Sequence, residues 1–247
     1  MSRPEARVPP IQEPRNLPIA RQPKPSPPDA VIFDMDGVLI DSNPYHLAKW
    51  AEFLGERGVP FDPEKLPDQI LGQRNDAALR LFFGPNLTSE QRHALSEDIE
   101  ARFRASFEPH ARPLPGLLTL IRECHAAGIP MAVASSAMKK NVDFVVEALG
   151  LAPYFEVLLN GDEVSRPKPD PEIYLRAAEH LKVSPSRAVA FEDSPVGIEA
   201  VVRAGIQCVA IASTFPFESL RDETGANCVV RSFEEMNLEG LRRLFDL

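Results

Sequence analysis

The sequence comprises 247 residues, of which 44% are hydrophobic and 26% are charged, so it can bury the core of one large domain or of two unequal ones. Its formal net charge of −9 at pH 7 argues against a general affinity for nucleic acids or anionic membrane surfaces. No apolar stretch is long enough to cross a bilayer, so neither a nucleic acid nor a membrane is expected as a partner.

The N-terminal segment differs in composition from the rest of the chain. Prolines recur from Pro4 to Pro28, and this stretch contains no aromatic residue. The prolines interrupt the continuous apolar section that a secretory signal would need. We therefore expect residues 1–28 to form a disordered, Pro-rich tail.

The first apolar run is followed at once by two acidic residues. Val31–Phe33 have the composition of a buried central strand, Asp34 and Asp36 come directly after it, and Gly37 allows the backbone to turn. Residues two apart on a strand point the same way, so both carboxylates can face one small volume and share a divalent cation. An isolated Asp-x-Asp also fits a simple turn after a strand, so the remainder of the chain decides between these interpretations.

Residues 43–110 have a helical pattern with few strand signals. Leu47, Trp50 and Leu54 lie on one face of a predicted helix that Gly58 can end, and residues 88–91 are typical of a helix start. Trp50 is interpreted as a core residue of this helix. We expect a small all-helical insert at 43–110, after the first strand, with residues 29–42 and 111–247 forming a second unit.

From residue 113 onward, predicted helices alternate with short apolar strands, which favours an α/β fold with a parallel sheet covered on both faces. The strands are expected at 131–135, 157–160, 188–191 and 208–211, and the helices at 117–127, 141–149, 171–181 and 194–204. Asp170 is expected to cap the third of these helices, with Pro171 as its first residue. The three cysteines lie in apolar stretches without paired or metal-ligand spacing, so we interpret them as reduced core residues of a cytoplasmic protein.

Ligands of such sheets bind at the carboxyl ends of the strands, and polar residues are expected there. They are Asp34 and Asp36 after the first strand, Ser135 and Ser136 after the second, Glu192 and Asp193 after the fourth, and Lys168 in a loop. Carboxylates, a hydroxyl and an ammonium group at one edge can hold Mg²⁺ and a phosphate together. Taken singly, Lys168 also fits a surface cation, and the Glu192–Asp193 pair also fits the charge often found at a helix N-terminus.

Asp34-Met-Asp36-Gly37, Ser135, Lys168 and Glu192-Asp193 resemble, in order and spacing, the four signature motifs of the haloacid dehalogenase superfamily. The helical insert resembles the cap of its β-phosphoglucomutase-like subgroup. The resemblance covers residues 29–247 and implies a Rossmann-like parallel sheet with helices on both faces, plus an all-helical cap inserted after the first strand.

The resemblance also implies roles for these residues. Asp34 becomes the nucleophile that forms an aspartyl-phosphate, Asp36 the general acid and base, Ser135 a ligand of the phosphoryl group, and Lys168 a counter-charge. Asp193, together with Glu192, completes a Mg²⁺ site with Asp34 and the backbone carbonyl of Asp36. Because a departing halide needs no proton, Asp36 favours phosphoryl transfer over dehalogenation.

Substrate recognition is expected to involve the cap. His46 matches a histidine that positions the acid/base aspartate in the subgroup, although it also fits a solvent-facing helix residue. Gly72, Arg74 and Asn75 match the substrate loop of the cap, but a true β-phosphoglucomutase has an arginine at the place of Asn75.

The segment after Ser135 departs from the mutase pattern as well. Ser136 and Lys139 are candidate substrate-binding residues, yet the segment lacks the serine and asparagine with which a mutase holds its second phosphate. These departures favour a Mg²⁺-dependent phosphatase acting on a phosphorylated sugar or similar small metabolite, expected to be a monomer. A β-phosphoglucomutase-type mutase is the alternative, and a non-catalytic protein that binds a phosphorylated ligand is a third possibility.

Overall fold

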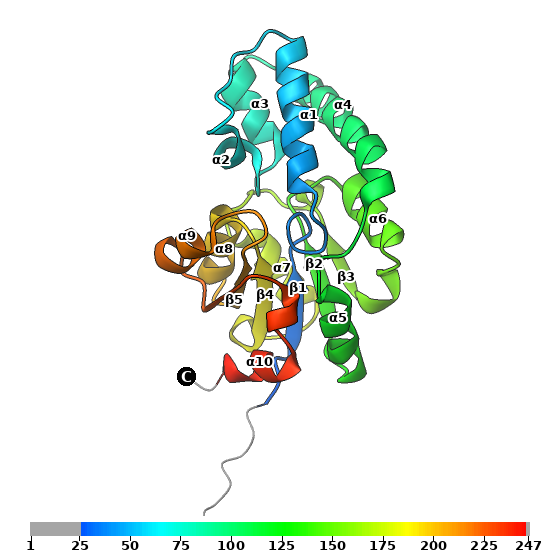
Figure 1. The fold of residues 1–247 in the computed structure, drawn as a ribbon, viewed down its shortest axis with the longest axis vertical. Coiled ribbons are helices and arrows are strands. Elements are labelled where there is room, and N and C mark those ends of the chain that lie inside the picture. Colours follow the sequence, from blue (N-terminus) through cyan, green and yellow to red (C-terminus); the bar gives the residue numbers. More distant parts are fainter. Residues whose placement is uncertain (1–25, 246–247) are drawn as a thin grey trace, which may run out of the picture.

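The computed structural model describes residues 26–245; most of the tail predicted at 1–28 lies outside the described residues. Six parallel strands form one sheet in the order β3-β2-β1-β4-β5-β6 (Figure 1). The strands are β1 (Ala30–Phe33), β2 (Met131–Ala134), β3 (Val157–Leu159), β4 (Ala188–Glu192), β5 (Gln207–Ile211) and β6 (Cys228–Val230). The α/β fold class and its parallel sheet are thus confirmed.

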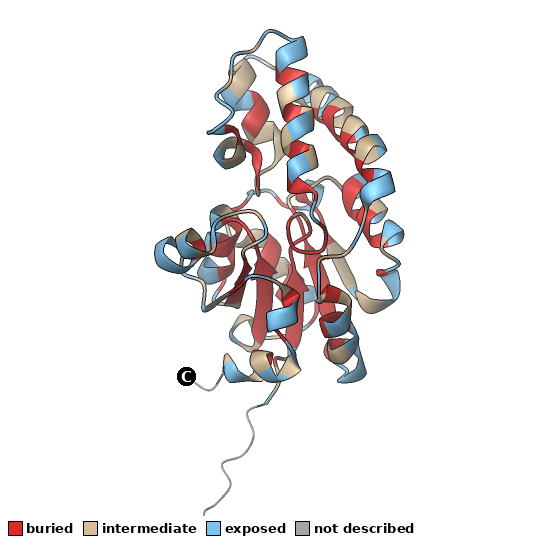
Figure 2. Ribbon diagram, viewed as in Figure 1, coloured by how far each residue is buried: buried red, intermediate tan, exposed pale blue. Residues whose placement is uncertain are grey.

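The two faces of the sheet differ in side-chain size. On one face, large residues such as Phe33 and Phe191 stack with 5.2 Å between ring centroids, and α5 (Leu117–Ala126), α6 (Lys139–Ala148) and α10 (Leu238–Arg243) cover them. On the other face, small residues such as Ala132 and Ala190 pack against α7 (Glu172–His180), α8 (Pro195–Arg203) and α9 (Phe217–Glu223). Both faces of the central strands are therefore buried (Figure 2), as their near-continuous apolar sequences predict.

Of the α-helices between β1 and β2 in the sequence, the four that precede α5 form the upper part of the molecule in Figure 1. They are α1 (Asn43–Glu56), α2 (Leu66–Ile70), α3 (Asn75–Phe83) and α4 (Ser89–Phe107). These helices, called the cap below, enclose a hydrophobic cluster of their own around Trp50 and Phe53. The predicted helical insert is confirmed, and Trp50 is a core residue as expected. Thr88 and Gln91 form a reciprocal capping box that starts α4.

Several predicted details required correction. Helix α7 begins at Glu172 rather than Pro171; Pro171 is its N-cap, and Asp170 accepts a hydrogen bond from the Glu172 backbone N–H (3.0 Å). Strand β6 and helices α9 and α10 were not predicted. Cys124 and Cys208 are buried and free, but Cys228 is only partly buried because it lies on the edge strand β6.

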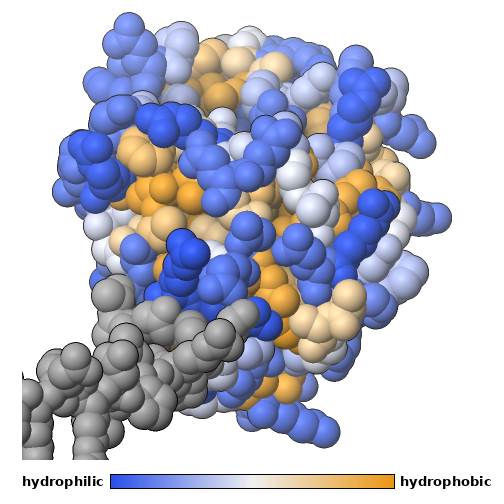
Figure 3. Space-filling model, turned by 60° about the horizontal axis from the view of Figure 1, so that its bottom comes forward, coloured by the Kyte–Doolittle hydropathy of each residue, from blue (hydrophilic) through white to orange (hydrophobic). Residues whose placement is uncertain are grey.

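The outer surface of the core has mixed polarity. Figure 3 shows the end of the core that faces away from the cap, where hydrophobic and hydrophilic side chains are interspersed. Within residues 26–245, none of the helices combines the length and the apolar character needed to cross a membrane.

Candidate active site

The predicted acidic residues lie at the carboxyl end of β1, next to β4 in the middle of the sheet. The backbone N–H of Asp34 donates to the carbonyl of Phe191 (3.0 Å), which fixes the end of β1 against β4. Gly37 then turns the chain with φ of +76°, and a Cβ at this position would lie 1.9 Å from Oδ2 of Asp193. Only glycine therefore lets this turn approach Asp193.

Lys168 is the cation of the site, and its side chain is buried. Its ammonium group donates to Oδ1 of Asp34 (2.7 Å), Oε1 of Glu192 (2.7 Å) and the carbonyl of Ala134 (3.2 Å). Burial lowers the pKa of Lys168, but the two carboxylates outweigh burial, so this pKa lies above its ordinary value. Lys168 thus carries a fixed positive charge between two strand ends, and the surface-cation alternative is wrong.

Burial has the opposite effect on Asp34, which is 5% exposed. It raises the pKa of this carboxyl to about 7, and Lys168 offsets only part of the effect. Lys168 binds Oδ1 of Asp34, whereas Oδ2 accepts none of the hydrogen bonds found among the described side chains. One oxygen of Asp34 is therefore held in place, and the other is left for a ligand.

Glu192, the last residue of β4, is fully buried, and both of its oxygens are engaged. Oε1 accepts from Lys168 and from the hydroxyl of Tyr174 (2.7 Å), while Oε2 accepts from the backbone N–H groups of Asp193 and Ser194 (3.0 and 3.2 Å). Glu192 thus joins Lys168 to the loop that starts α8. Glu192 provides the negative charge expected at the N-terminus of α8, and it also holds the ammonium group of Lys168 in place.

Asp193 completes a cluster with Asp34 and Glu192, in which one ligand atom of each lies within 4.8 Å of the others. Oδ2 of Asp193 accepts from Nδ2 of Asn43 (2.9 Å) and from the hydroxyl of Thr214. Burial and the neighbouring negative charges of Glu192 and Asp34 raise the pKa of Asp193 well above its ordinary value. Three buried carboxylates facing one lysine have excess negative charge, and this oxygen-rich set fits a hard divalent cation.

Asp36 belongs to a separate pair with His46. Oδ1 of Asp36 accepts from the hydroxyl of Ser42 (2.5 Å) and lies 3.2 Å from Nε2 of His46. Burial raises the pKa of Asp36, but His46 and Ser42 outweigh it, so the net shift is downward. The pKa of His46 is raised in turn, because the charge of Asp36 outweighs the cost of burial. His46 also stacks on Phe103 of α4 (3.8 Å between centroids), so it does not face solvent.

A cavity of about 350 Å³ lies next to these residues, between the core and the cap. Asp34, Asp36 and Ser135 line it from the core, and His46 lines it from α1. Ser136 also lines it and donates to the carbonyl of Gly72 in the cap (3.0 Å). Such a volume falls in the range of small-molecule sites.

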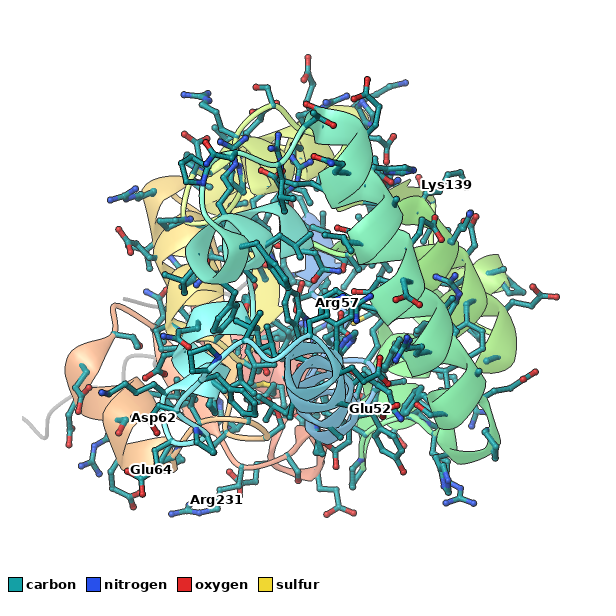
Figure 4. The ribbon with its side chains drawn as sticks, turned by 90° about the horizontal axis from the view of Figure 1, so that it is seen from above. Glu52, Arg57, Asp62, Glu64, Lys139 and Arg231 are labelled. Carbon is teal, nitrogen blue, oxygen red and sulfur yellow. The ribbon has the colours of Figure 1, made fainter. Side chains whose placement is uncertain are left out.

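The residues of the expected substrate loop line this cavity, but the side chains of Arg74 and Asn75 are already engaged in hydrogen bonds. Arg74 lines it but donates to the carbonyl of Val164 (3.2 Å), and Asn75 lines it but donates to Glu100 (2.6 Å). Lys139 does not line it: its ammonium group binds Asp143 (2.7 Å), one turn along α6. In Figure 4, seen from above, Lys139 lies at the rim of the molecule.

Sequence reasoning missed Tyr174, Asn43, Thr214 and Glu100. Asn43 and Thr214 lie 171 positions apart in the sequence but bond to each other (2.7 Å) and to Asp193. No spacing rule links such residues. Glu100 was hidden because a single acidic residue in a charged helix is typical of a solvent-facing position.

Comparison with known proteins identifies the family. Residues 28–205 match the model of the haloacid dehalogenase-like hydrolases. The chain belongs to this family.

Relatives of this hydrolase include both expected activities. The chain is 30% identical over 211 residues to a phosphorylated carbohydrates phosphatase of Thermotoga maritima, and the match covers 85% of this chain and 97% of that protein. It is 28% identical over 218 residues to a β-phosphoglucomutase of Bacillus subtilis, with coverage of 85% and 92%. The structure of a family IA hydrolase from Entamoeba histolytica superposes with a TM-score of 0.80 at 27% identity, covering 88% of this chain and 99% of that one.

The Asp36–His46 pair gives a testable titration. We expect the pKa of His46, followed by NMR of the imidazole ring, to lie above the ordinary value of about 6.5 in the wild type. In Asp36→Asn it should fall to or below that value, because burial remains while the attractive charge is lost. By linkage, the raised pKa of His46 stabilises the fold below about pH 6.5, and this stabilisation disappears as the pH rises through the folded-state value.

Asp29→Asn, at the opposite end of β1, is the control and should leave the His46 titration unchanged. An unchanged titration in Asp36→Asn would contradict the ion pair.

Proposed function

We propose that this hydrolase is a Mg²⁺-dependent phosphatase that acts on a phosphorylated sugar or similar small metabolite through an aspartyl-phosphate. One observation carries the proposal: Asp34 lies at the cavity floor with one oxygen held by Lys168 and the other unengaged, beside the Asp36–His46 pair. A nucleophile and a proton-carrying pair in one small cavity are the two requirements of phosphate-ester cleavage.

The metal is proposed to bind Asp34, Asp193 and the backbone carbonyl of Asp36. Glu192 is close enough to join them, but its oxygens already accept hydrogen bonds from Lys168, Tyr174 and the start of α8. We therefore assign Glu192 to holding Lys168. When bound, Mg²⁺ would offset the negative charge of the carboxylates and of the incoming phosphate.

In the first step, Oδ2 of Asp34 attacks phosphorus as the bond from phosphorus to the ester oxygen breaks. Lys168 keeps Asp34 oriented, and Ser135, which lines the cavity, is proposed to bind the phosphoryl oxygens. The departing oxygen needs a proton, which the Asp36–His46 pair holds: His46 has a raised pKa and lies 3.2 Å from Asp36. The proton passes from Nε2 of His46 to Asp36 and from Asp36 to the leaving oxygen, which releases the alcohol.

In the second step, Asp36 removes a proton from water, and the resulting hydroxide attacks phosphorus. The bond between phosphorus and Oδ2 of Asp34 breaks, inorganic phosphate leaves, and the pair regains its proton. The cap forms the wall of the cavity opposite Asp34, and we propose that it limits the access of water to the reacting phosphorus.

Phosphatase activity is preferred to mutase activity because of Asn75 and Lys139. A mutase must hold a second phosphate, but the amide of Asn75 is engaged by Glu100 and the ammonium of Lys139 by Asp143. The similarity to the Bacillus subtilis β-phosphoglucomutase makes a sugar-phosphate mutase the second candidate. The domain limits at 43 and 110, the monomeric state and the cytoplasmic location remain predictions from the sequence.

The choice between the two activities can be measured directly. With β-glucose 1-phosphate and Mg²⁺, we expect phosphate release, followed by a colorimetric assay, to exceed glucose 6-phosphate formation, followed by a coupled dehydrogenase. EDTA should abolish phosphate release and Mg²⁺ should restore it. Isomerisation faster than release would instead make the protein a mutase.

The proton role of Asp36 predicts a dependence on the leaving group. In Asp36→Asn, kcat for an alkyl sugar phosphate should fall by about 10²–10⁴, the usual contribution of general acid–base catalysis. The formation of the phospho-enzyme from p-nitrophenyl phosphate should fall much less, because nitrophenolate leaves without a proton. This step is measured as the burst of nitrophenolate in stopped flow. Equal losses of both rates would contradict the assignment.

A further inference from the structure

Helix α4 presents a polar stripe to the cavity. The α4 residues that line it are separated by three, four, seven and eleven positions from the first, so they share one face of the helix: Ser89, Arg92, His93, Ser96 and Glu100. A helix face that only packs against its neighbours is normally apolar. A polar face directed into a cavity indicates contact with a polar ligand.

Glu100 is the unusual member of this stripe, because it is a carboxylate that is only 4% exposed. Oε1 accepts from the side-chain amide of Asn75 in the cap (2.6 Å), and Oε2 accepts from the amide of Asn141 in α6. Both donors are neutral, and among residues 26–245 no ion pair to Glu100 is found. A buried carboxylate is stable only with sufficient hydrogen bonds, and its two oxygens can accept about four in total.

Neither arginine that lines the cavity pairs with Glu100, and His46, whose pKa the charge of Glu100 helps to raise, makes its ion pair with Asp36. Arg92 is bound to Asp76 and to the carbonyl of Leu87, and Arg74 binds the carbonyl of Val164. The phosphate end of a substrate is proposed to lie at Asp34 and Ser135 on the core side of the cavity. The cap side thus presents a carboxylate with unused acceptor positions to the remainder of the substrate.

We infer that Glu100 is a specificity-determining residue, whose carboxylate accepts hydrogen bonds from hydroxyl groups of the sugar part of a phosphate monoester. This inference rests on the proposed phosphatase function and deepens it. The carboxylate favours hydroxyl donors and repels a second phosphate at the same wall. It also distinguishes polyhydroxylated substrates from phosphate esters without hydroxyl groups.

The test compares Glu100→Gln with the wild type on glucose 6-phosphate, fructose 1-phosphate and ribose 5-phosphate, and on p-nitrophenyl phosphate, which has no hydroxyl group on its organic part. We expect kcat/KM for the best sugar phosphate to fall about 10- to 100-fold, the range for hydrogen bonds to a charged group. The value for p-nitrophenyl phosphate should stay within about threefold.

Glu97→Gln is the matched control. Glu97 lies on α4 one turn before Glu100 and also contacts α6, through Lys140 (2.8 Å), but it does not line the cavity. It should therefore change kcat/KM for both substrate types by the same factor. If Glu100→Gln also lowers both equally, or lowers neither, Glu100 is only a contact between cap and core, and the inference is overturned.

Glu100→Asp provides a second variant that keeps the charge. It should retain more of the sugar-phosphate selectivity than Glu100→Gln, provided that circular dichroism shows the same fold for both. If the wild type cleaves p-nitrophenyl phosphate but none of the sugar phosphates, the inference fails while the phosphatase chemistry stands. If Asp34-dependent cleavage is absent for every ester, the proposed function itself fails.

Discussion

The buried contact of Lys168 with Asp34 and Glu192 is the interaction on which the site depends. It joins the ends of β1 and β4 to the loop before α7, and Tyr174 of α7 donates to the same oxygen of Glu192. Removing one partner of a buried ion pair typically costs about 3–5 kcal/mol, because the remaining charge is left without compensation. The nucleophile candidate is therefore held by a buried network of charged groups, and a rigid, preorganised charge arrangement is what phosphoryl transfer requires.

The cap contributes in a different way. It has its own hydrophobic cluster around Trp50. It contacts the core through polar groups, such as Ser136 with Gly72 and Glu100 with Asn141, and through Phe103 and Phe107 of α4, which belong to the hydrophobic cluster of the core. At Gly72, a Cβ would lie 2.5 Å from Oγ of Ser194, so the cap loop approaches the start of α8 closely. Core and cap thus form opposite walls of one cavity: Asp34, Asp36 and Ser135 line it from the core, and His46 and Glu100 line it from the cap.

Much of the core was predictable from the sequence, because strong local signals coincide there. The apolar runs at Val31–Phe33 and Ala188–Phe191 predicted the two central strands, and the polar residues at their ends predicted a site at one edge of the sheet. The short edge strand β6 was missed although Cys228–Val230 form a short apolar run; two of its three residues are only partly buried. Local sequence patterns do not predict an element whose structure depends on contacts with residues far away in the sequence.

The candidate site could be predicted only in part for the same reason. Asp34, Asp36 and Lys168 could be found because each follows a strand or occurs in a recognisable motif. The hydrogen bonds that hold the Glu192 side chain could not be predicted, since they come from Tyr174 and from the start of α8. Lys139 was expected near the substrate, but its position in α6 places Asp143 within reach on the same helix face. Sequence identifies the chemical groups, whereas their partners follow from the fold.

The most direct test of the account is whether Asp34 becomes phosphorylated. The protein would be mixed with Mg²⁺ and a phosphate monoester, quenched in acid within milliseconds, reduced with borohydride and digested for mass spectrometry. The account predicts homoserine at position 34, the product of reducing an aspartyl-phosphate, and none in Asp34→Asn. Steady phosphate release with an unmodified Asp34 at every quench time, or modification at another carboxylate, would contradict it.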